Sequence, residues 1–269
     1  YDNLLPSLSL SLPVGKTQMQ LGYGATIKRP SYYDMRSGIG YDNRYTYESG
    51  NPLLVSEISR NINYTVSYKW LMAEGIYTHV SDPIVMLTQS YKDNPNIALI
   101  QNVNWKPYNR IGASLSASPK FGIWHPSLSL YFFKQWFDME THGGHSLDNP
   151  KFTVRFDNTI DTKLFTISLM MTAQTKGDDE TSYMYRNYFS TNLSIYKSFF
   201  KGKLLVFFYA NDLLGTGNMH SRMYSGAMRE IVHHDYSISD YSLTIRYRFN
   251  VSKSKYKGTG AGMEQKGRI

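Results

Sequence analysis

The sequence of 269 residues contains no cysteine, few charged residues and no long hydrophobic run. The absence of cysteine excludes a small domain held by disulfides, a thiolate metal site and a thiol nucleophile. Charged residues make up 19% of the chain, below the ~25% of an average soluble domain. No segment approaches the ~18 consecutive apolar residues of a membrane-spanning helix. Aromatic residues are abundant instead, with 23 Tyr, 13 Phe and 4 Trp.

The chain carries a formal net charge of +8, but half of this excess lies in the lysine-rich segment 251–269. The remaining charge is spread along residues 1–250 without clusters. A nucleic-acid-binding protein should show a basic stripe with interleaved aromatic residues, and the sequence has none. We therefore divide the chain into an ordered part, residues 1–250, and a basic tail, residues 251–269, and expect no nucleic-acid partner.

Apolar and polar residues alternate with a period of two along most of the chain. Serine and leucine alternate over residues 7–12, and an apolar residue stands at every second position of 17–28 and of 241–249. This alternation predicts β-strands that have one apolar and one polar face. We predict eleven strands, at about 5–12, 17–28, 57–68, 71–90, 97–118, 125–138, 151–158, 163–175, 184–197, 203–212 and 241–249.

Short and long connections alternate between these strands. The long connections fall at 29–56, 91–96, 139–150, 176–183 and 213–240. Short turns at one end and long loops at the other are typical of an outer-membrane barrel, and several strands exceed the ~9–11 residues needed to cross the hydrocarbon. A soluble sandwich would have strands of ~5–6 residues. We predict an all-β fold, an antiparallel transmembrane β-barrel.

The strand count suggests that this barrel is incomplete. Bacterial single-chain barrels have an even number of strands, with both chain ends in the periplasm. Eleven is odd, and it is half of the about 22 strands of plugged outer-membrane transporters. The chain also begins with Tyr1 and shows no leader segment. Either the alternation pattern misses one strand, or the chain is one half of a larger barrel.

Motifs near both ends of the chain resemble TonB-dependent receptor-like outer-membrane proteins. The early motifs are Leu-Pro-Ser-Leu at 5–8, Arg-Pro-Ser-Tyr at 29–32, Tyr-Thr-Tyr at 45–47 and Gly-Asn-Pro-Leu at 50–53. The final Arg-Tyr-Arg-Phe-Asn, followed by a Lys- and Gly-rich segment, is similar to one branch, the outer-membrane β-barrel family. One departure is Ser56, where the family more often has proline before the glutamate.

The resemblance implies the C-terminal half of a barrel of about 22 strands that takes up a substrate across the outer membrane. An N-terminal plug and the segment that engages TonB would belong to the rest of the protein and are not contained in this sequence. The implied partners are outer-membrane lipid and lipopolysaccharide, the outer-membrane insertion machinery, the plug and TonB. The tail 251–269 would lie in the periplasm. No cofactor is implied.

Five tyrosines of the first long connection are candidates for ligand contact at the mouth of the barrel. Aromatic rings also bury well against one another, so packing among the loops is the alternative, and we favour it. The tyrosines are Tyr32, Tyr33, Tyr41, Tyr45 and Tyr47.

The last predicted strand contains two further kinds of candidate residue. Arg246 and Arg248 stand at polar positions, so they would line the lumen or contact the plug. Tyr247 and Phe249 stand at apolar positions and close the strand with aromatic rings. The family resemblance implies that this ending is the signal read by the insertion machinery.

Histidines and acidic residues in the long connections are candidate metal ligands. His142 and His145, His233 and His234, and His220 all fall in predicted loops, and a transition metal needs about four ligands in fixed geometry. We expect no metal site there.

The acidic segment 178–180 lacks the spaced ligands of a calcium loop, so we expect a solvated loop tip. No Gly-x-Ser-x-Gly elbow occurs, and we expect no catalytic residue and no enzymatic activity.

Two other functions stay open at this point. A complete smaller barrel could act as a pore, an adhesin or a structural protein of the envelope. A soluble all-β module could use its tyrosines to bind glycans. The alternation keeps nearly all charge off one face, where Arg or Lys in lipid would cost ~2–4 kcal/mol at the midplane, and this favours a membrane barrel over the soluble module. The family resemblance then makes the uptake receptor the favoured interpretation.

Overall fold

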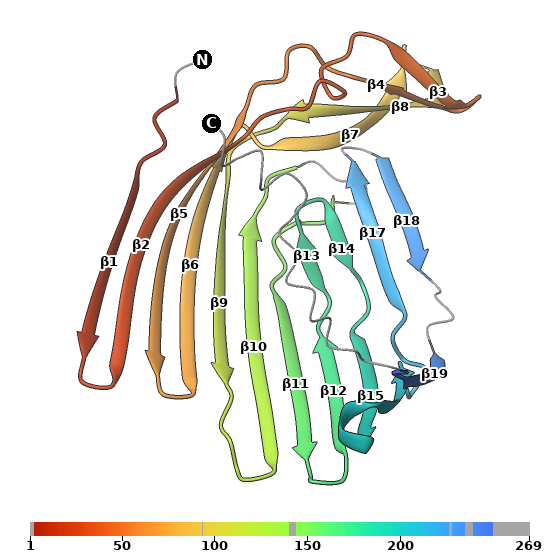
Figure 1. Cartoon of the computed structure of the whole chain (residues 1–269). Helices are drawn as coiled ribbons and strands as arrows, with labels where there is room; N and C mark the ends of the chain where they lie inside the picture. The colour runs from red at the N-terminus through yellow and green to blue at the C-terminus, as the bar shows by residue number, and fades with distance from the viewer. Residues whose placement is uncertain (1–2, 93, 140–143, 226–227, 235–238, 250–269) are drawn as a thin grey trace, which may run out of the picture.

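The structure is a computed structural model that describes residues 3–92, 94–139, 144–225, 228–234 and 239–249 (Figure 1). Its largest element is an eleven-stranded sheet whose strand order follows the chain. All neighbouring strands of this sheet are antiparallel. The strands are β1 (Ser7–Val14), β2 (Thr17–Lys28), β5 (Glu57–Tyr68), β6 (Leu71–Ser81), β9 (Tyr108–Ala117), β10 (Trp124–Trp136), β11 (Lys151–Asp161), β12 (Thr166–Gln174), β15 (Tyr188–Phe199), β16 (Leu204–Asn211) and β19 (Asp240–Tyr247).

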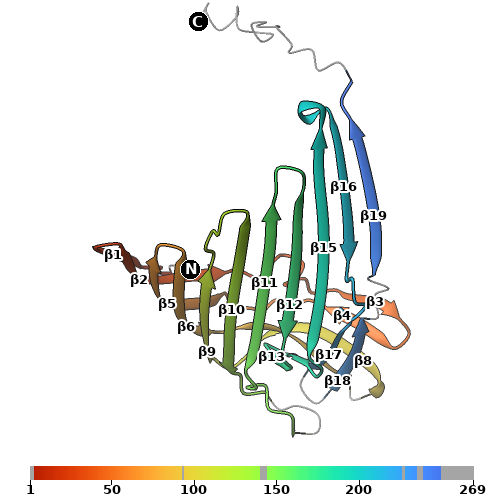
Figure 2. The same cartoon turned by 90° about the horizontal axis from the view of Figure 1, so that it is seen from below.

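The predicted count of eleven strands and the antiparallel all-β fold are confirmed. Within the described residues, β1 and β19 are the two ends of the sheet and do not pair with one another. Figure 2 shows them at opposite ends of a curved sheet. The sheet is therefore the open wall of an incomplete transmembrane barrel. No helix among the described residues has the length and the apolar character that spanning a bilayer would require.

The strand register sorts the side chains onto two continuous faces. Directly paired residues share a face, and successive residues alternate between faces. Leu21 pairs with Leu10 on one side and with Tyr64 on the other, while its neighbour Gln20 pairs with Ser11 and Thr65. We call the first surface the apolar face and the second the polar face.

Both faces continue from strand to strand across the whole sheet. The apolar face includes Leu8, Leu10, Met19, Leu21, Ile62, Tyr64, Val66, Leu115, Leu128, Leu130, Val154, Phe156, Leu169, Leu193, Phe208, Leu243 and Ile245. The polar face includes Ser9, Ser11, Gln18, Gln20, Asn61, Asn63, Thr65, Ser114, Ser116, Ser129, Thr159, Ser168, Asn192, Ser194, Ser242 and Thr244.

Two predicted strands were too long, because each is interrupted by proline. The predicted strand 71–90 divides at Asp82-Pro83 into β6 and β7 (Ile84–Tyr91), and Asp82 has a positive φ of 51°. The predicted strand 97–118 divides before Pro107 into β8 (Asn94–Asn104) and β9. Proline has no N–H to give to a central ladder, so the chain leaves the main sheet at both points.

The long connections contain strands that the sequence reading missed. In segment 29–56, β3 (Ile39–Asn43) and β4 (Thr46–Ser49) join β8 and β7 in a four-stranded sheet. Strand β4 pairs with β8 in parallel, unlike every pair of the main sheet. A second four-stranded sheet contains β13 (Gly177–Asp179), β14 (Ser182–Met184), β17 (Met219–Ser225) and β18 (Met228–His234). We call these two the outer sheets; Figure 1 shows them beyond the long-loop end of the main sheet.

The buried core lies at the long-loop end, where the ends of two wall strands meet the long connections. It consists of Val80 of β6, Tyr108 of β9, and Val85, Phe137, Met139, Leu147 and Tyr224. The two outer sheets are also joined by hydrogen bonds, since the Ser225 hydroxyl donates to the Met86 carbonyl at 3.1 Å and accepts from the Thr88 amide at 2.6 Å. The loop end is therefore a packed structure that could position residues over the lumen.

Candidate functional site

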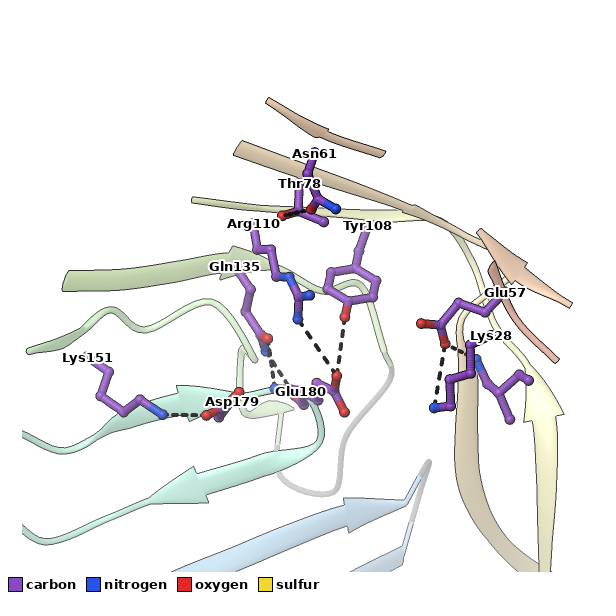
Figure 3. A network of polar contacts seen from close by, with 11 residues as sticks. Lys28, Glu57, Asn61, Thr78, Tyr108, Arg110, Gln135, Lys151, Asp179 and Glu180 are labelled. Atoms are coloured by element: carbon purple, nitrogen blue, oxygen red, sulfur yellow. Dashed lines mark hydrogen bonds and ion pairs between the residues drawn. The ribbon is translucent and has the colours of Figure 1, made fainter. Parts of the chain in front are cut away.

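The hairpin that joins β13 to β14 lies against the polar face near the long-loop end (Figure 3). Gln135, at the end of β10, is fully buried. Its Nε2 donates to the Glu180 carbonyl at 2.8 Å, and its Oε1 accepts from the Glu180 amide at 2.7 Å. The side-chain amide of Gln135 thus forms two hydrogen bonds with the Glu180 backbone, as the backbone of a neighbouring strand would. The buried polar atoms of the Gln135 side chain therefore have partners.

The Glu180 side chain is held by two groups from the start of β9. The Arg110 guanidinium lies 4.0 Å from Glu180 Oε1, and the Tyr108 hydroxyl donates to the same oxygen at 3.5 Å. Glu180 is half-exposed, so the ion pair itself adds ~0–1 kcal/mol. Most of the anchoring therefore comes from the buried backbone pairing with Gln135.

The two aspartates of the same turn have different surroundings. Asp178 has no exposed surface and accepts hydrogen bonds from the Asn149 amide at 2.8 Å and from its side-chain Nδ2 at 2.7 Å. His145 Nε2 lies 2.8 Å from the second Asp178 oxygen. Asp179 is exposed and forms an ion pair with Lys151.

The expectation of a solvated loop tip at 178–180 is therefore wrong for Asp178, which is buried, while Asp179 and Glu180 are exposed. The spacing of the three acidic residues carried no information on their partners, which come from segments 108–110, 135 and 145–151. Gly177 allows the close approach, because a Cβ there would lie 2.5 Å from the Pro150 carbonyl oxygen.

A recess of about 490 Å³ lies beside the anchored hairpin. Its lining mixes charged groups with thioethers: Lys151, Gln174, Asp179, Glu180, Met184 and Met219. A second recess, of about 340 Å³, lies lower on the polar face and is lined mainly by Asp157, Thr159, Ser168, Asn192, Ser194 and Tyr209. Both open toward the side of the wall on which the register places the polar residues.

The five candidate tyrosines do not form one surface. Tyr41 and Tyr47 meet edge to face at 4.6 Å, and Tyr47 also contacts Tyr91 at 5.0 Å. Tyr33 donates to Glu48 at 3.1 Å and lies under the Arg36 guanidinium at 3.6 Å. Tyr33, Tyr41 and Tyr47 thus contact other loop residues, as the favoured alternative of packing among the loops predicts.

Four of the five tyrosines are exposed. The exposed fraction is 97% for Tyr32, 69% for Tyr41 and 59% for both Tyr33 and Tyr45. The Arg44 guanidinium lies 5.7 Å from the centre of the Tyr45 ring.

The segment that carries Tyr32 is attached to β8 through Asp34. The Asp34 carboxylate accepts hydrogen bonds from the Ser31 hydroxyl at 2.6 Å, from the Ser31 amide at 3.0 Å and from Asn102 Nδ2 at 2.9 Å. The hydrogen bonds from Ser31 are the main reason why the pKa of Asp34 lies below its ordinary value. Charge on Asp34 therefore favours the attached loop.

The pairing of the last strand fixes the faces of its candidate residues. Arg246 pairs with Leu205 and lies on the polar face with Ser242 and Thr244. Tyr247 pairs with Leu204 on the apolar face, and its ring contacts that of Phe249 at 4.6 Å.

The ladder continues for one residue beyond Tyr247. The Arg248 amide donates to the Lys203 carbonyl at 2.8 Å. The last described residue, Phe249, is 82% exposed. The tail 251–269 lies outside the described residues.

The described residues contain no group of three or more His, Cys, Asp or Glu side chains arranged to hold a metal ion. His145 stacks on Tyr224 with 4.7 Å between ring centres, and His220 lies 5.8 Å from the Tyr185 ring. His142 and the side chains of His233 and His234 are outside the described residues.

An open antiparallel sheet with one apolar and one polar face, short turns at one edge and packed loops at the other defines the wall of an outer-membrane β-barrel. The chain belongs to the Outer membrane protein beta-barrel family, whose profile matches residues 1–247. A comparison with curated protein sequences finds no match.

Several solved structures share the fold. The siderophore receptor PirA from Pseudomonas aeruginosa superposes with a TM-score of 0.60 at 18% identity, over 81% of this chain and 41% of that one. The copper transporter OprC gives 0.63 at 12% identity, over 90% and 38% of the two chains. The FrpB iron transporter from Neisseria meningitidis gives 0.58 at 14% identity, over 92% and 39%. The chain thus spans less than half the length of these proteins.

Proposed function

We propose that the chain forms part of the barrel wall of a TonB-dependent outer-membrane receptor that takes up a substrate. The observation that carries the proposal is the continuous division of eleven paired strands into an apolar and a polar face. Such a wall suits lipid on one side and a wet lumen on the other. The similar structures are a siderophore receptor, a copper transporter and an iron transporter, and this supports uptake over catalysis.

The rest of the receptor would supply the missing half of the wall, the plug and the segment that engages TonB. Support for a larger barrel comes from the open sheet and from coverage of only 41% and 38% of the first two similar structures. The open sheet also disfavours a complete smaller barrel. Energised transport would then require the whole receptor.

Residue roles follow from the same arrangement. In the proposed receptor Arg246 and Arg248 face the lumen or the plug, and Tyr247 and Phe249 form the assembly signal. Tyr32, which is 97% exposed and the most open member of the tyrosine group, is the strongest candidate for ligand contact. The anchored turn at Glu180 and the recess beside it line the path from the mouth into the lumen. The tail 251–269 lies in the periplasm.

The lack of cysteine makes the proposal directly testable. We would introduce single cysteines as Tyr45→Cys in a long loop, Lys120→Cys in a short turn, Gln20→Cys on the polar face and Leu21→Cys on the apolar face. Each variant is labelled with a membrane-impermeant maleimide, first on intact cells and then in isolated membranes.

On intact cells we expect labelling at position 45 and none at 120. In membranes we expect labelling at 20 and protection at 21, because lipid covers only the apolar face. Labelling of 21 as fast as 20 would refute the membrane wall, and labelling of 120 alone on intact cells would reverse its orientation. An upstream reading frame without a plug would refute the TonB-dependent receptor while leaving the barrel in place.

A further inference from the structure

The short turns of the main sheet share a feature that the transport function does not use: each contains lysine. The five hairpins β1–β2, β5–β6, β9–β10, β11–β12 and β15–β16 turn at one edge of the sheet, and four of these turns are seen along the lower edge in Figure 1. We call it the short-turn edge. Its lysines are Lys16, Lys69, Lys120, Lys163, Lys201 and Lys203, and all six are exposed.

Acidic residues are scarce beside these lysines. The nearest in sequence is Asp161, two residues before Lys163, and it accepts a hydrogen bond from the Thr166 hydroxyl at 2.8 Å. The turn segments 15–16, 69–70, 118–123, 162–165 and 200–203 contain no Asp or Glu. None of the six forms an ion pair with an acidic residue in the part of the chain that the structure describes.

The long-loop end is different, because its connections contain acidic residues as well as basic ones. Lys106 lies 2.8 Å from Asp138, and Arg36 lies 3.4 Å from Glu48. Connections that contain lysine and no acidic residue are therefore a property of the short-turn edge.

Exposed apolar side chains stand beside the lysines in the same turns. The exposed fractions are 53% for Trp70, 56% for Phe121, 58% for Ile123, 66% for Leu164 and 69% for Phe200. Side chains of this size exposed next to lysine in turn after turn are unfavourable in water. They become favourable where an apolar phase begins directly next to a charged, hydrated layer, as at a membrane interface.

Two lysines at this edge are positioned over aromatic rings. Lys69 Nζ lies 5.1 Å from the Tyr68 ring, and Lys197 Nζ lies 4.7 Å from the Phe199 ring. Tyr68 and Phe199 both lie on the apolar face, through their pairing with Leu71 and Leu204. The aliphatic stems can thus follow the rings while the ammonium groups stay at the level of the headgroups.

We propose that the short-turn edge binds anionic phospholipid headgroups of the leaflet that it faces, with the neighbouring apolar side chains inserted at the acyl boundary. The inference rests on the proposed function, since it needs the wall to stand in a bilayer. Neighbouring hairpins are two strands apart, or ~10 Å. The lysines are therefore too widely spaced for one phosphate, and they suit a row of headgroups around the barrel. Anionic lipid attracts basic residues held near its surface.

The test compares two variants with the same change in charge. The first is Lys69→Gln, Lys120→Gln and Lys163→Gln, at the short-turn edge. The control is Arg44→Gln, Lys92→Gln and Lys176→Gln, at the long-loop end, where Lys92 Nζ also lies 5.1 Å from a ring, that of Tyr91. Both variants and the unchanged sequence are placed in the whole receptor, which is inserted into phosphatidylcholine vesicles with and without phosphatidylglycerol. Retained phosphatidylglycerol is then counted by native mass spectrometry after extraction.

We expect the unchanged chain and the control to retain phosphatidylglycerol and the short-turn variant to retain about tenfold less. A third variant, Lys69→Arg, Lys120→Arg and Lys163→Arg, should retain it as the unchanged chain does, which separates loss of charge from damage to the turns. Equal retention by the short-turn variant and the control would overturn the proposal.

The two proposals fail in different ways. If the whole receptor with the unchanged chain does not insert into phosphatidylcholine vesicles, the membrane wall itself is wrong. If it inserts but retains no more phosphatidylglycerol than phosphatidylcholine, only the lipid-binding edge is wrong.

Discussion

Gln135 and Glu180 are joined by two hydrogen bonds, from Gln135 Nε2 to the Glu180 carbonyl at 2.8 Å and from the Glu180 amide to Gln135 Oε1 at 2.7 Å. They are 45 residues apart in the sequence, and Gln135 is fully buried. This pairing fixes the β13–β14 hairpin against the polar face of β10. In the proposed receptor it sets how far a long loop reaches over the lumen.

Substitution of Gln135 by alanine should release this hairpin. The change leaves the amide and the carbonyl of Glu180 without partners, and an unsatisfied buried polar group costs ~1–3 kcal/mol. We expect faster hydrogen exchange in segment 177–184 and easier proteolysis there, while the strands of the wall stay protected. Gln20→Ala is the matched control, because Gln20 is an exposed glutamine on the same face. Equal exchange in the two variants would show that Gln135 does not hold the hairpin.

The approach of the hairpin also requires the absence of a side chain at Gly177. A Cβ there would lie 2.5 Å from the Pro150 carbonyl oxygen and 3.0 Å from Lys151 Cα, both backbone atoms. Gly177→Ala should therefore destabilise the loop end by ~1–3 kcal/mol, measured as a lower midpoint of thermal unfolding in detergent. Gly24→Ala provides the comparison, since a Cβ at Gly24 meets nothing within 4 Å. A midpoint unchanged by Gly177→Ala would mean that the hairpin can shift without loss.

The wall could be predicted from the sequence because its signal is long and local. Residues 17–28 were assigned to the correct strand by alternation alone, and pairing then fixed the face of every residue in β2. The shortest strands of the outer sheets carry no such signal, since β13 and β14 have three residues each and β4 has four. A period of two cannot be recognised over so few positions.

The contacts of the β13–β14 hairpin could not be predicted from the sequence, for a different reason. Gln135 has the same polarity as any lumen-facing residue, and its partner is set by how the chain returns 45 residues later. The sequence predicts a solvated tip for the acidic segment 178–180, because the basic and amide residues that contact this segment are distant in sequence. Only the tertiary contacts distinguish Asp178, which is buried, from Asp179, which is exposed.

Acid should loosen the loop that contains Tyr32 and Tyr33. Hydrogen bonds from Ser31 lower the pKa of Asp34 in the folded chain from its ordinary value of 3.8. Because its pKa is lowered on folding, ionised Asp34 contributes its full stabilisation at a pH above its ordinary pKa. This stabilisation is lost as the pH falls through the lower pKa of the folded chain. We expect faster proteolysis by pepsin within segment 31–54 as the pH falls below about 4, and the same faster cleavage at higher pH in Asp34→Ala. If the rate of cleavage shows no difference between the native chain and this variant, Asp34 does not hold the loop.

The two faces of the wall can be tested with a pair of adjacent residues. Leu21 lies on the apolar face opposite Leu10 and Tyr64, whereas Gln20 lies on the polar face opposite Ser11 and Thr65. Leu21→Arg should place a charge in lipid and cost up to ~2–4 kcal/mol, while Gln20→Arg should cost little because the lumen is wet. The yield of the folded, inserted form of the whole receptor in phosphatidylcholine vesicles, followed by protection from trypsin, should fall for Leu21→Arg and stay close to normal for Gln20→Arg. The reverse order would place the apolar face toward the lumen and would remove the basis for the membrane wall, because charge can be tolerated only on the side that meets water.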